Sequence, residues 1–347
     1  MTAAMKIQVN ARNGAQRFEA QPAQKILYAG LGAAIALPYE CASGTCGTCK
    51  ARLLSGEIDD AWPEAPGRKA LKGSDEFLMC QCSARGDVSI EVAAFLHDLP
   101  SGAIVPQAST GSIGATSLLT HDVMQIDIAV EAPMEFDAGQ FVMLRVPGVD
   151  GYRGWSMINY EHKARLLRFV VKKKPGGGLS DWLFAQARTG TPVELFGPLG
   201  SATFQPWLDK NLLCIAGGSG IAGMMSILAR AEQENYFAKH TGQVFFGVRT
   251  MKDAFFLDEF SRLCRQCGDG LRVTVALSDE AAAPCSEHPL LAFESGFVHE
   301  VAKQAMQGRY EGVRAYLAGP PPAVDASVRM LLMARMSTAN IRYDKFS

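Results

Sequence analysis

Four cysteines constrain this chain more than any other feature of its sequence. They are Cys41, Cys46, Cys49 and Cys80. The first three share one short loop rich in glycine, serine and threonine, and the fourth follows much farther along the chain. This spacing is typical of a [2Fe–2S] cluster. Gly44 and Gly47 suit such a loop, because glycine tolerates positive φ and brings no side chain near the inorganic sulfur atoms. The loop therefore predicts a carrier of single electrons.

Disulfides and zinc are the alternatives for these thiols. The chain holds nine cysteines, an odd number, in 347 residues, and we expect no secretory leader, so the cysteines indicate a reducing compartment and a cytoplasmic location. Zinc ribbons favour paired Cys-x-x-Cys knuckles, which the triplet does not form. Cys82 lies two residues after Cys80, so the pattern alone leaves two choices for the fourth ligand.

Residues 5–95 resemble the plant-type ferredoxins. That family places its fourth ligand in a Leu-x-Cys-Gln context, which implies that Cys80 binds the cluster and that Cys82 is a buried bystander. The resemblance also implies a β-grasp fold for the N-terminal part. Many relatives carry Arg after the first ligand, whereas this chain has Ala42 and Ser43. The missing cation implies a shifted cluster potential, because net charge and hydrogen bonding set that potential.

Composition excludes some classes of partner. Lys and Arg number 34 against 35 Asp and Glu, for a net charge of −1, so we expect no nucleic acid and no anionic membrane as partner. The segment 212–229 carries no charge and approaches the length of a membrane span. Glycines interrupt it, however, so we interpret it as a buried strand, a turn and a helix. We expect a monomer that acts on small molecules and proteins.

Three compositional blocks divide the chain. Residues 1–97 hold the cysteine loop, an edge strand at 6–10 and a helix at 24–34, and residues 98–111 form a linker rich in Pro, Gly and Ser. Residues 112–207 predict an antiparallel β-barrel, with strands at 123–130, 141–146, 166–172 and 192–196. Residues 208–347 predict a doubly wound parallel sheet, with strands at 212–216, 243–248, 271–277 and 315–318 and helices at 224–233 and 258–266.

A cation, an aromatic ring and a hydroxyl lie close together in the barrel block, at Arg153, Trp155 and Ser156. A flavin dinucleotide needs such groups for its pyrophosphate, its ring and the edge of that ring. Farther on, glycines at 176–178 precede a predicted helix, whose first N–H groups suit a phosphate. Each motif alone also fits an ordinary strand edge or turn.

Together and in this order, the two motifs resemble the ferredoxin–NADP⁺ reductase superfamily. Its flavin barrel carries Arg-x-Tyr-Ser, then Gly-Gly-x-x-Ser. The resemblance implies an FAD site, to which these residues contribute: Arg153 and Ser180 for the phosphates, Gly177 and Leu179 through their backbone, Trp155 by stacking, and Ser156 at the reactive ring edge. Trp155 replaces the usual Tyr, which keeps the stacking and removes a hydroxyl.

A second glycine-rich loop follows an apolar strand and precedes a helix. It contains Gly217, Gly218, Ser219 and Gly220. A dinucleotide phosphate needs such close backbone approach at a helix N-terminus. Arg249 follows the next strand, and Gly319 with Pro320 follows a later one. These positions are at the carboxyl ends of predicted parallel strands, where open α/β sheets bind ligands.

The same superfamily has Gly-Gly-x-Gly, a Cys-Gly-Pro-Pro turn and a final aromatic residue. This chain has Ala318 in place of that Cys. The resemblance implies that Asp344 lies near Ser156 and that Phe346 covers the flavin, so we assign catalytic roles to these three residues. A C-terminal edge strand with an aromatic anchor is the alternative interpretation of the last residues.

The order of the three blocks suggests a route for electrons. A hydride carries two electrons and a cluster accepts one, and a flavin links the two chemistries. The layout resembles the NADH-dependent reductase components of bacterial multicomponent mono- and dioxygenases. It implies FAD, a [2Fe–2S] cluster, NADH, and a hydroxylase or Rieske-type ferredoxin as acceptor. The alternatives are an electron-transfer subunit that does not oxidise nicotinamide itself and a redox-sensing module.

Overall fold

A computed structural model describes residues 4–186 and 188–345. The chain forms two compact units. The first contains the chain up to Thr110 together with Val142–Gly154 and Glu194–Leu199. The second contains Gly111–Phe141, Trp155–Val193 and the chain from Gly200 onward. Each unit is described by itself below.

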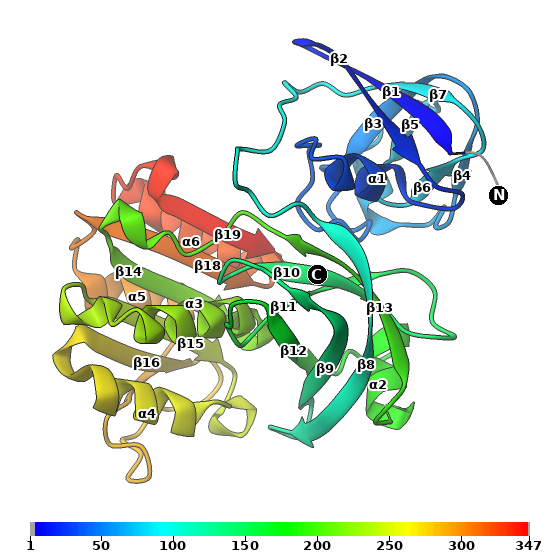
Figure 1. Ribbon diagram of the computed structural model, residues 1–347. Helices are drawn as coiled ribbons and strands as arrows, with labels where there is room; N and C mark the ends of the chain where they lie inside the picture. The colour runs from blue at the N-terminus through cyan, green and yellow to red at the C-terminus, as the bar shows by residue number, and fades with distance from the viewer. Residues whose placement is uncertain (1–3, 187, 346–347) are drawn as a thin grey trace. The chain divides into compact units, whose positions relative to one another are not determined.

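The N-terminal part of the first unit is a mixed sheet with one helix (Figure 1, blue). Its elements are β1 (Met5–Ala11), β2 (Gly14–Ala20), α1 (Ile26–Gly32), β3 (Lys50–Ser55), β4 (Ile58–Asp60), the 3₁₀ turn η1 (Pro66–Ala70), β5 (Glu76–Leu78), β6 (Cys82–Ala84) and β7 (Val88–Glu91). Five strands follow the order β2-β1-β7-β3-β5, and β4 pairs with β6 in a separate ribbon. This is the β-grasp arrangement that the sequence predicts.

The prediction of an edge strand at 6–10 is wrong. β1 pairs antiparallel with β2 and parallel with β7, so it lies inside the sheet. Its side chains alternate, and Ile7 and Val9 are fully buried while their neighbours are partly exposed. One face of β1 covers the core and the other faces outward. Pairing partners on both sides cannot be seen in the alternation of a single strand.

The helix α1 is held by packing rather than by capping. Six of its seven residues are buried, and no side chain caps its N-terminus. A Cβ on Gly30 would lie 3.1 Å from Cζ of Phe18 in β2, so the helix lies close against the sheet. A helix this short is marginal alone and depends on such contacts.

The middle of the chain forms a second six-stranded sheet. Its elements are β8 (Gln107–Leu118), β9 (Val123–Met134), β10 (Phe141–Arg145), β11 (Arg153–Ser156), β12 (Ala164–Lys172), α2 (Gly178–Gln186) and β13 (Pro192–Leu199). The strand order is β11-β10-β13-β8-β9-β12, and β9 pairs antiparallel with both β8 and β12. All four predicted strands are present. β8 was not predicted, because its first residues lie in the segment assigned to the linker.

The C-terminal part is a parallel sheet covered on both faces. Its strands are β14 (Asn211–Gly217), β15 (Gly242–Val248), β16 (Leu271–Leu277), β17 (Ala292–Ser295), β18 (Val313–Gly319) and β19 (Ile341–Lys345). Its helices are α3 (Ile221–Gln233), α4 (Leu257–Cys267), α5 (Val298–Met306) and α6 (Pro321–Met333). The order is β17-β16-β15-β14-β18-β19, and each strand pairs parallel with its neighbours. The predicted doubly wound sheet is therefore confirmed.

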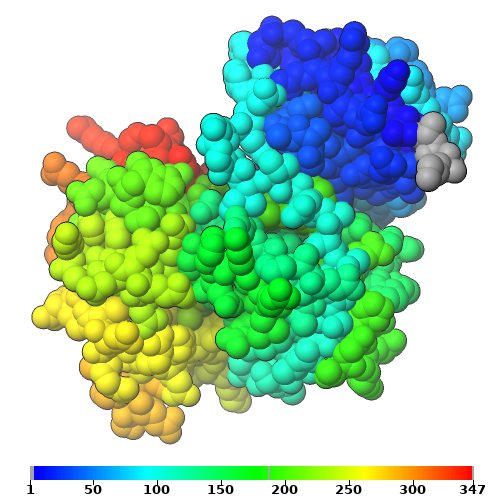
Figure 2. All heavy atoms as spheres, in the orientation of Figure 1, coloured from blue at the N-terminus to red at the C-terminus, as the bar shows by residue number. Residues whose placement is uncertain are grey.

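Two separate cores lie on the two faces of this sheet. One combines α3 and α4 with inward side chains such as Cys214 and Phe246, and the other combines α5 and α6 with Ile215 and Phe245. Consecutive strand residues thus point to opposite cores, as a strand period of two requires. Figure 2 shows side chains of the green-to-yellow segments closing over the near face.

The uncharged segment 212–229 has the predicted strand, turn and helix. β14 ends at Gly217, a short 3₁₀ turn follows, and α3 begins at Ile221. Among residues 4–186 and 188–345, no helix has the length and the apolar composition needed to cross a bilayer.

Polar contacts join the middle strands to the parallel sheet within the second unit. The backbone N–H of Gly139 donates to Ser226 Oγ at 2.8 Å, and Arg230 pairs with Asp137 at 3.2 Å. The Arg230 guanidinium also lies 5.1 Å from the ring centre of Tyr160. These contacts fix the middle and the last part of α3 against the strands that precede it.

Candidate redox sites

The four predicted cluster ligands lie in two close pairs. Cys49 Sγ and Cys80 Sγ are 3.2 Å apart, although the residues are far apart in sequence. Cys41 Sγ accepts the backbone N–H of Cys46 at 3.4 Å. The structure describes all nine cysteines as free thiols. Two pairs of soft sulfur donors beside each other fit a [2Fe–2S] cluster, which takes four thiolates.

The loop already stabilises negative charge on sulfur. A hydrogen bond with Cys46 and further bonds from the loop lower the pKa of Cys41 to about 4. The same contact raises the pKa of Cys46. The N–H of Thr48 donates to Cys46 Sγ at 3.4 Å, so backbone donors surround the sulfur atoms as a cluster requires.

Gly44 and Gly47 adopt positive φ, at +90° and +81°. A Cβ on Gly47 would lie 2.7 Å from the Gly67 carbonyl oxygen, and one on Gly44 would lie 2.9 Å from Gln81 Nε2. Both glycines are therefore required by conformation and by space, as the sequence predicts. Gln81 also donates to Cys80 Sγ at 3.4 Å, which ties the distant ligand to the loop.

Cys82 is placed differently from Cys80. It lies in β6, opposite Asp60 of the neighbouring strand β4, and is fully buried. Burial raises the pKa of its thiol to about 12, which favours the protonated form. No hydrogen bond joins Cys82 Sγ to another thiol within the described parts of the chain, so the geometry favours Cys80 as the fourth ligand.

The predicted flavin cation, Arg153, begins β11 and is partly buried. Its Nη1 donates to the Tyr152 carbonyl at 3.0 Å, and its guanidinium lies 5.3 Å from the ring centre of Trp62. Burial lowers the pKa of Arg153, and within residues 4–186 and 188–345 no carboxylate forms an ion pair with it. A partly buried cation without a carboxylate partner fits an anionic ligand such as a pyrophosphate.

Ser156 ends β11 and is almost fully buried, while Trp155 beside it is half-buried and 6.0 Å from Phe169. The Ser156 Oγ has no hydrogen-bond partner among the residues that the structure describes, so it is available to a ligand. A Cβ on Gly223 in α3 would lie 3.7 Å from this Oγ. The predicted flavin-edge hydroxyl therefore lies beside the helix that follows the nicotinamide loop.

In the turn before α2, the side chain predicted to bind the flavin phosphates, Ser180, forms hydrogen bonds within the turn itself. Ser180 Oγ accepts the Lys174 N–H at 3.1 Å and also contacts the Gly177 carbonyl at 3.1 Å. Asp181 accepts the Gly176 N–H at 3.1 Å, which places a carboxylate at the predicted phosphate position. Leu179 is buried in α2. Within the described residues, the N–H groups of Lys174, Gly176 and Gly177 already have acceptors in this turn. The groups left for an anion are therefore the first N–H groups of α2.

The two glycine motifs of the parallel sheet meet at one point. Gly217 ends β14 and Gly319 ends β18, the neighbouring strands where the strand order reverses direction. A Cβ on Gly319 would lie 2.9 Å from the Gly217 carbonyl oxygen, and one on Gly220 would lie 2.6 Å from the backbone of Gly319. Gly218 has φ +54°. Such a switch point is where doubly wound sheets bind dinucleotides.

The remaining nicotinamide candidates surround this switch point. Ser219 lies in the turn between β14 and α3, and Pro320 precedes α6. Arg249 is exposed after β15, and its carbonyl accepts the N–H of Asp279 at 2.9 Å. Glu280 accepts the N–H of Met251 at 2.9 Å. Asp279 and Glu280 do not stand out in the sequence, because only the folded sheet brings the ends of β15 and β16 together.

The end of the chain forms the sheet edge β19, as the alternative interpretation of the last residues proposed. Asp344 is in register with Ala318 of β18. Ser156 and Asp344 thus both adjoin the switch point, Ser156 through Gly223 and Asp344 through Ala318. Phe346, the predicted flavin cover, lies outside the described residues.

Three family models match the chain in the order of these sites. Residues 9–85 match the 2Fe-2S iron-sulfur cluster binding domain. Residues 111–204 match the oxidoreductase FAD-binding domain, and residues 214–329 match the oxidoreductase NAD-binding domain.

Similar proteins have the same layout along their whole length. The chain is 33% identical over 334 residues to ferredoxin–NAD(P)⁺ reductase CarAd of Metapseudomonas resinovorans, covering 93% of this chain and 94% of the relative. It is 32% identical over 340 residues to the ferredoxin–NAD⁺ reductase component of the alkene monooxygenase system of Xanthobacter autotrophicus, covering 96% and 99%. The solved ferredoxin reductase in carbazole 1,9a-dioxygenase matches with a TM-score of 0.83 and 32% identity over the whole of both chains.

The chain belongs to the family of reductase components of multicomponent oxygenases. It is accordingly an oxidoreductase, and its cofactors are FAD, a [2Fe–2S] cluster and NADH. As an oxygenase reductase it departs from the wider superfamily pattern at Trp155 and Ala318. Ala318 is buried against Gly220, so a larger side chain there would crowd the glycine loop of this reductase.

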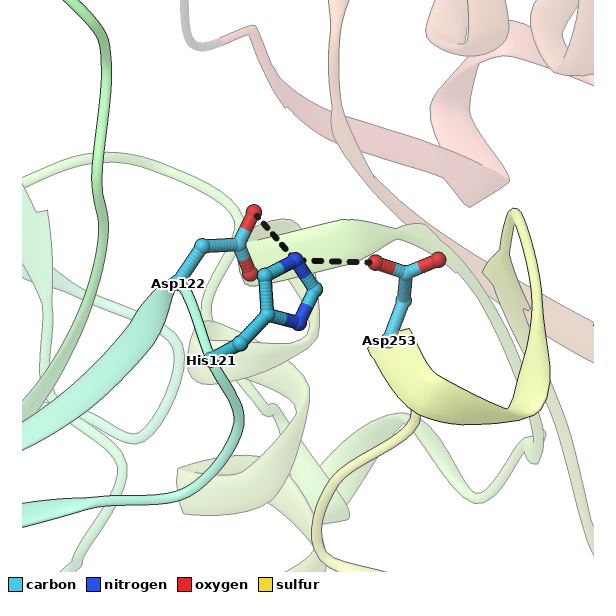
Figure 3. A group of neighbouring side chains, drawn as sticks. All are labelled: His121, Asp122 and Asp253. Carbon is cyan, nitrogen blue, oxygen red and sulfur yellow. Dashed lines mark ion pairs between the residues drawn. The ribbon is translucent and has the colours of Figure 1, made fainter.

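One further group of metal-ligand side chains lies away from these sites. His121 Nε2 is 3.8 Å from Asp122 and 4.0 Å from Asp253, as Figure 3 shows. Asp122 also pairs with Lys172 at 3.1 Å, and Asp253 accepts two hydrogen bonds from Thr250. Since both carboxylates already have partners and His121 is exposed, the group acts in this reductase as a contact between two chain segments of the second unit.

Proposed function

We propose that this oxygenase reductase takes electrons from NADH through FAD to the [2Fe–2S] cluster and delivers them to an oxygenase partner. The acceptor we propose is a hydroxylase or a Rieske-type ferredoxin, met by a monomeric chain in the cytoplasm. When bound, the flavin accepts a hydride and releases electrons singly. We retain the division into residues 1–97, 98–111, 112–207 and 208–347 as the functional modules of this proposal.

One observation carries the proposal: the nicotinamide loop and the flavin-edge hydroxyl share one place in the second unit. Gly220 lies against the backbone of Gly319 at the end of β18, and Gly223, one turn later, lies against Ser156. The glycines leave room for a dinucleotide, and the Ser156 hydroxyl remains available for the ring edge. A nicotinamide and a flavin bound in this way would face each other across the start of α3.

The roles of individual residues follow from their surroundings. Arg153 supplies the charge for the flavin pyrophosphate, and Trp155 supplies a stacking surface. The start of α2, with Leu179, supplies backbone N–H groups, whereas Gly177 and Ser180 hold the turn that presents them. Cys41, Cys46, Cys49 and Cys80 hold the cluster, and Asp344 with Phe346 would complete the cover of the flavin.

A reduction experiment tests the proposal. Purified protein loaded with FAD and iron is titrated anaerobically with NADH while the absorbance of flavin and cluster is followed. We expect both chromophores to bleach. A flavin that bleaches only with dithionite would favour the alternative of an electron-transfer subunit, and bleaching by NADH without transfer to any acceptor protein would favour a redox-sensing module.

A further inference from the structure

Tyr28 contacts two separate segments of the first compact unit. Its ring stacks on Phe196 of β13, with ring centres 4.4 Å apart and planes at 12°. It also meets the edge of Tyr152, at 5.5 Å and 89°. Its hydroxyl donates to the Ala42 carbonyl at 3.0 Å. Tyr28 and Phe196 are each only 4% exposed, so their stack is excluded from water, while Tyr152 is partly exposed.

The hydroxyl reaches the cluster loop directly beside a predicted ligand. Ala42 follows Cys41, is fully buried and has φ +53°. This left-handed conformation is uncommon for a residue other than glycine and persists only where surrounding contacts fix it. The hydrogen bond from Tyr28 is such a contact, so the phenol helps to set the shape of the loop at its first ligand.

The other side of the contact is also fixed in place. The Tyr152 hydroxyl donates to Glu194 at 2.9 Å, and Arg145 pairs with the same carboxylate. The Arg145 guanidinium lies 5.6 Å from the centre of the Tyr152 ring. Aromatic rings whose orientation is set by neighbouring contacts form a pre-organised surface for a partner ring.

A purely apolar core would not need this tyrosine. A phenylalanine would give the same stack, and the described contacts give the hydroxyl one partner, the Ala42 carbonyl. A second contact in the first unit has Arg153 over the ring of Trp62. Residues on both sides of the cysteine loop, Tyr28 before it and Trp62 after it, therefore contact the segment 152–153, and the Tyr28 hydroxyl bonds to the loop backbone.

We propose that Tyr28 is a positioning residue for electron transfer within the chain. Its ring seats the cluster loop on Phe196 and Tyr152, and its hydroxyl holds the loop by the Ala42 carbonyl. The inference rests on the proposed function, because it concerns transfer from the flavin to the cluster. A small displacement of reacting groups has a large effect on rate when their separation is set by such contacts.

The test compares Tyr28→Leu, Phe196→Leu and the double variant in the protein loaded with FAD and iron. After anaerobic rapid mixing with NADH, flavin bleaching and cluster bleaching are timed separately. We expect Phe196→Leu to slow cluster reduction about tenfold, which is the loss expected for one aromatic stack. Tyr28→Leu should slow it about thirtyfold, because it removes the hydrogen bond of the hydroxyl as well. Flavin reduction should keep its normal rate. The double variant should be no slower than Tyr28→Leu alone, because both changes remove the same stack.

Three further measurements separate positioning from general damage. Phe18→Leu, a matched change inside the sheet that carries the cluster, should leave cluster reduction unchanged. Tyr28→Phe should retain most of the rate, with a loss of about threefold from the missing hydrogen bond. Amide hydrogen exchange in residues 192–199 should rise in Tyr28→Leu and stay low in Phe18→Leu.

The outcomes are decisive in both directions. Multiplicative effects of Tyr28→Leu and Phe196→Leu, or an equal slowing in Phe18→Leu, would overturn the positioning role. Iron content is measured in each variant, and Phe196→Leu keeps the test valid if Tyr28→Leu loses its cluster. Failure of the proposed function would be seen separately, as absent flavin bleaching in the unaltered protein.

Discussion

The cluster loop and the proposed nicotinamide loop both rely on glycines, but they differ in the part of the chain that would contact the ligand. Both place glycines at positive φ, and both are closed by backbone from a distant part of the chain, Gly67 in the first case and Gly319 in the second. In the cluster loop the glycines make room for side chains that act as ligands. In the proposed nicotinamide loop they would make room for a ligand that contacts the backbone itself.

This difference decides which substitutions matter. The cluster loop depends on the identity of four thiols, because no other side chain gives the same soft donor. The nicotinamide loop depends on the absence of side chains, because a Cβ on Gly220 would collide with the turn after β18. Removing a ligand should therefore abolish one step completely, whereas adding a methyl group should weaken another step.

The largest effect is expected for Cys46→Ser. A serine hydroxyl replaces the thiolate that accepts the Thr48 N–H, so the cluster is lost or unstable. Electron transfer to a protein acceptor should disappear. NADH-dependent reduction of ferricyanide should remain, because the flavin can reduce this dye without the cluster. Steady-state assays with both acceptors check this. Equal loss of both activities would contradict the proposed order of carriers.

The two neighbouring cysteines give the matched control for that experiment. Cys80→Ala should lose iron as Cys46→Ser does. Cys82→Ala should retain iron and acid-labile sulfide, with a loss of unfolding free energy of about 1 kcal/mol from the small cavity it leaves. Iron loss in Cys82→Ala with retention in Cys80→Ala would reverse the assignment of the fourth ligand.

The next largest effect is expected for two glycine substitutions, one in each loop. Gly47→Ala forces a Cβ to 2.7 Å from the Gly67 oxygen, and Gly220→Ala forces one to 2.6 Å from the backbone of Gly319. Each should lower the unfolding free energy by about 1–3 kcal/mol. Gly47→Ala should lower iron content and keep flavin reduction by NADH, and Gly220→Ala should do the reverse.

Gly86→Ala is the control for the pair, because a Cβ there meets nothing within 4 Å. Iron analysis and anaerobic flavin reduction are measured on all three variants. The contrast between the loops would fail if both variants damaged the same step.

Local spacing predicted the [2Fe–2S] domain that the family model matches, whereas the individual ligands stay predictions and other features needed the fold. Cys41 to Cys49 lie within one loop, and the loop contacts observed around them are those that the glycines implied. β17 and the start of β8 escaped prediction, because a four-residue edge strand and a strand rich in Ser, Thr and Gly carry little hydrophobic pattern. The partners of Tyr28 are contacts between distant segments, which no local pattern encodes.

At the proposed nicotinamide site, the sequence likewise does not show which charged residues lie beside one another. Taken alone, Arg249 is a cation at the carboxyl end of a strand and would suit a 2′-phosphate. In the folded sheet the ends of β15 and β16 lie together, and the Arg249 carbonyl accepts the N–H of Asp279. Sequence separation hides this acidic neighbour, although it changes the electrostatic interpretation of Arg249.

The smallest effect is expected for a substitution of Asp279, the acidic neighbour of Arg249. Asp279 and Glu280 are exposed at the edge where the adenosine end of a dinucleotide would lie, and their charge would repel a 2′-phosphate. Asp279→Asn should improve the use of NADPH relative to NADH about fivefold, the most that one exposed charge contributes. The ratio of kcat/KM for the two nucleotides, measured at low ionic strength, checks this. Because the Asp279 backbone N–H still donates to Arg249, the turn should keep its shape and the KM for NADH should hardly change. An unchanged ratio would mean that the nicotinamide loop selects its ligand by shape alone, which would sharpen its contrast with the cluster loop.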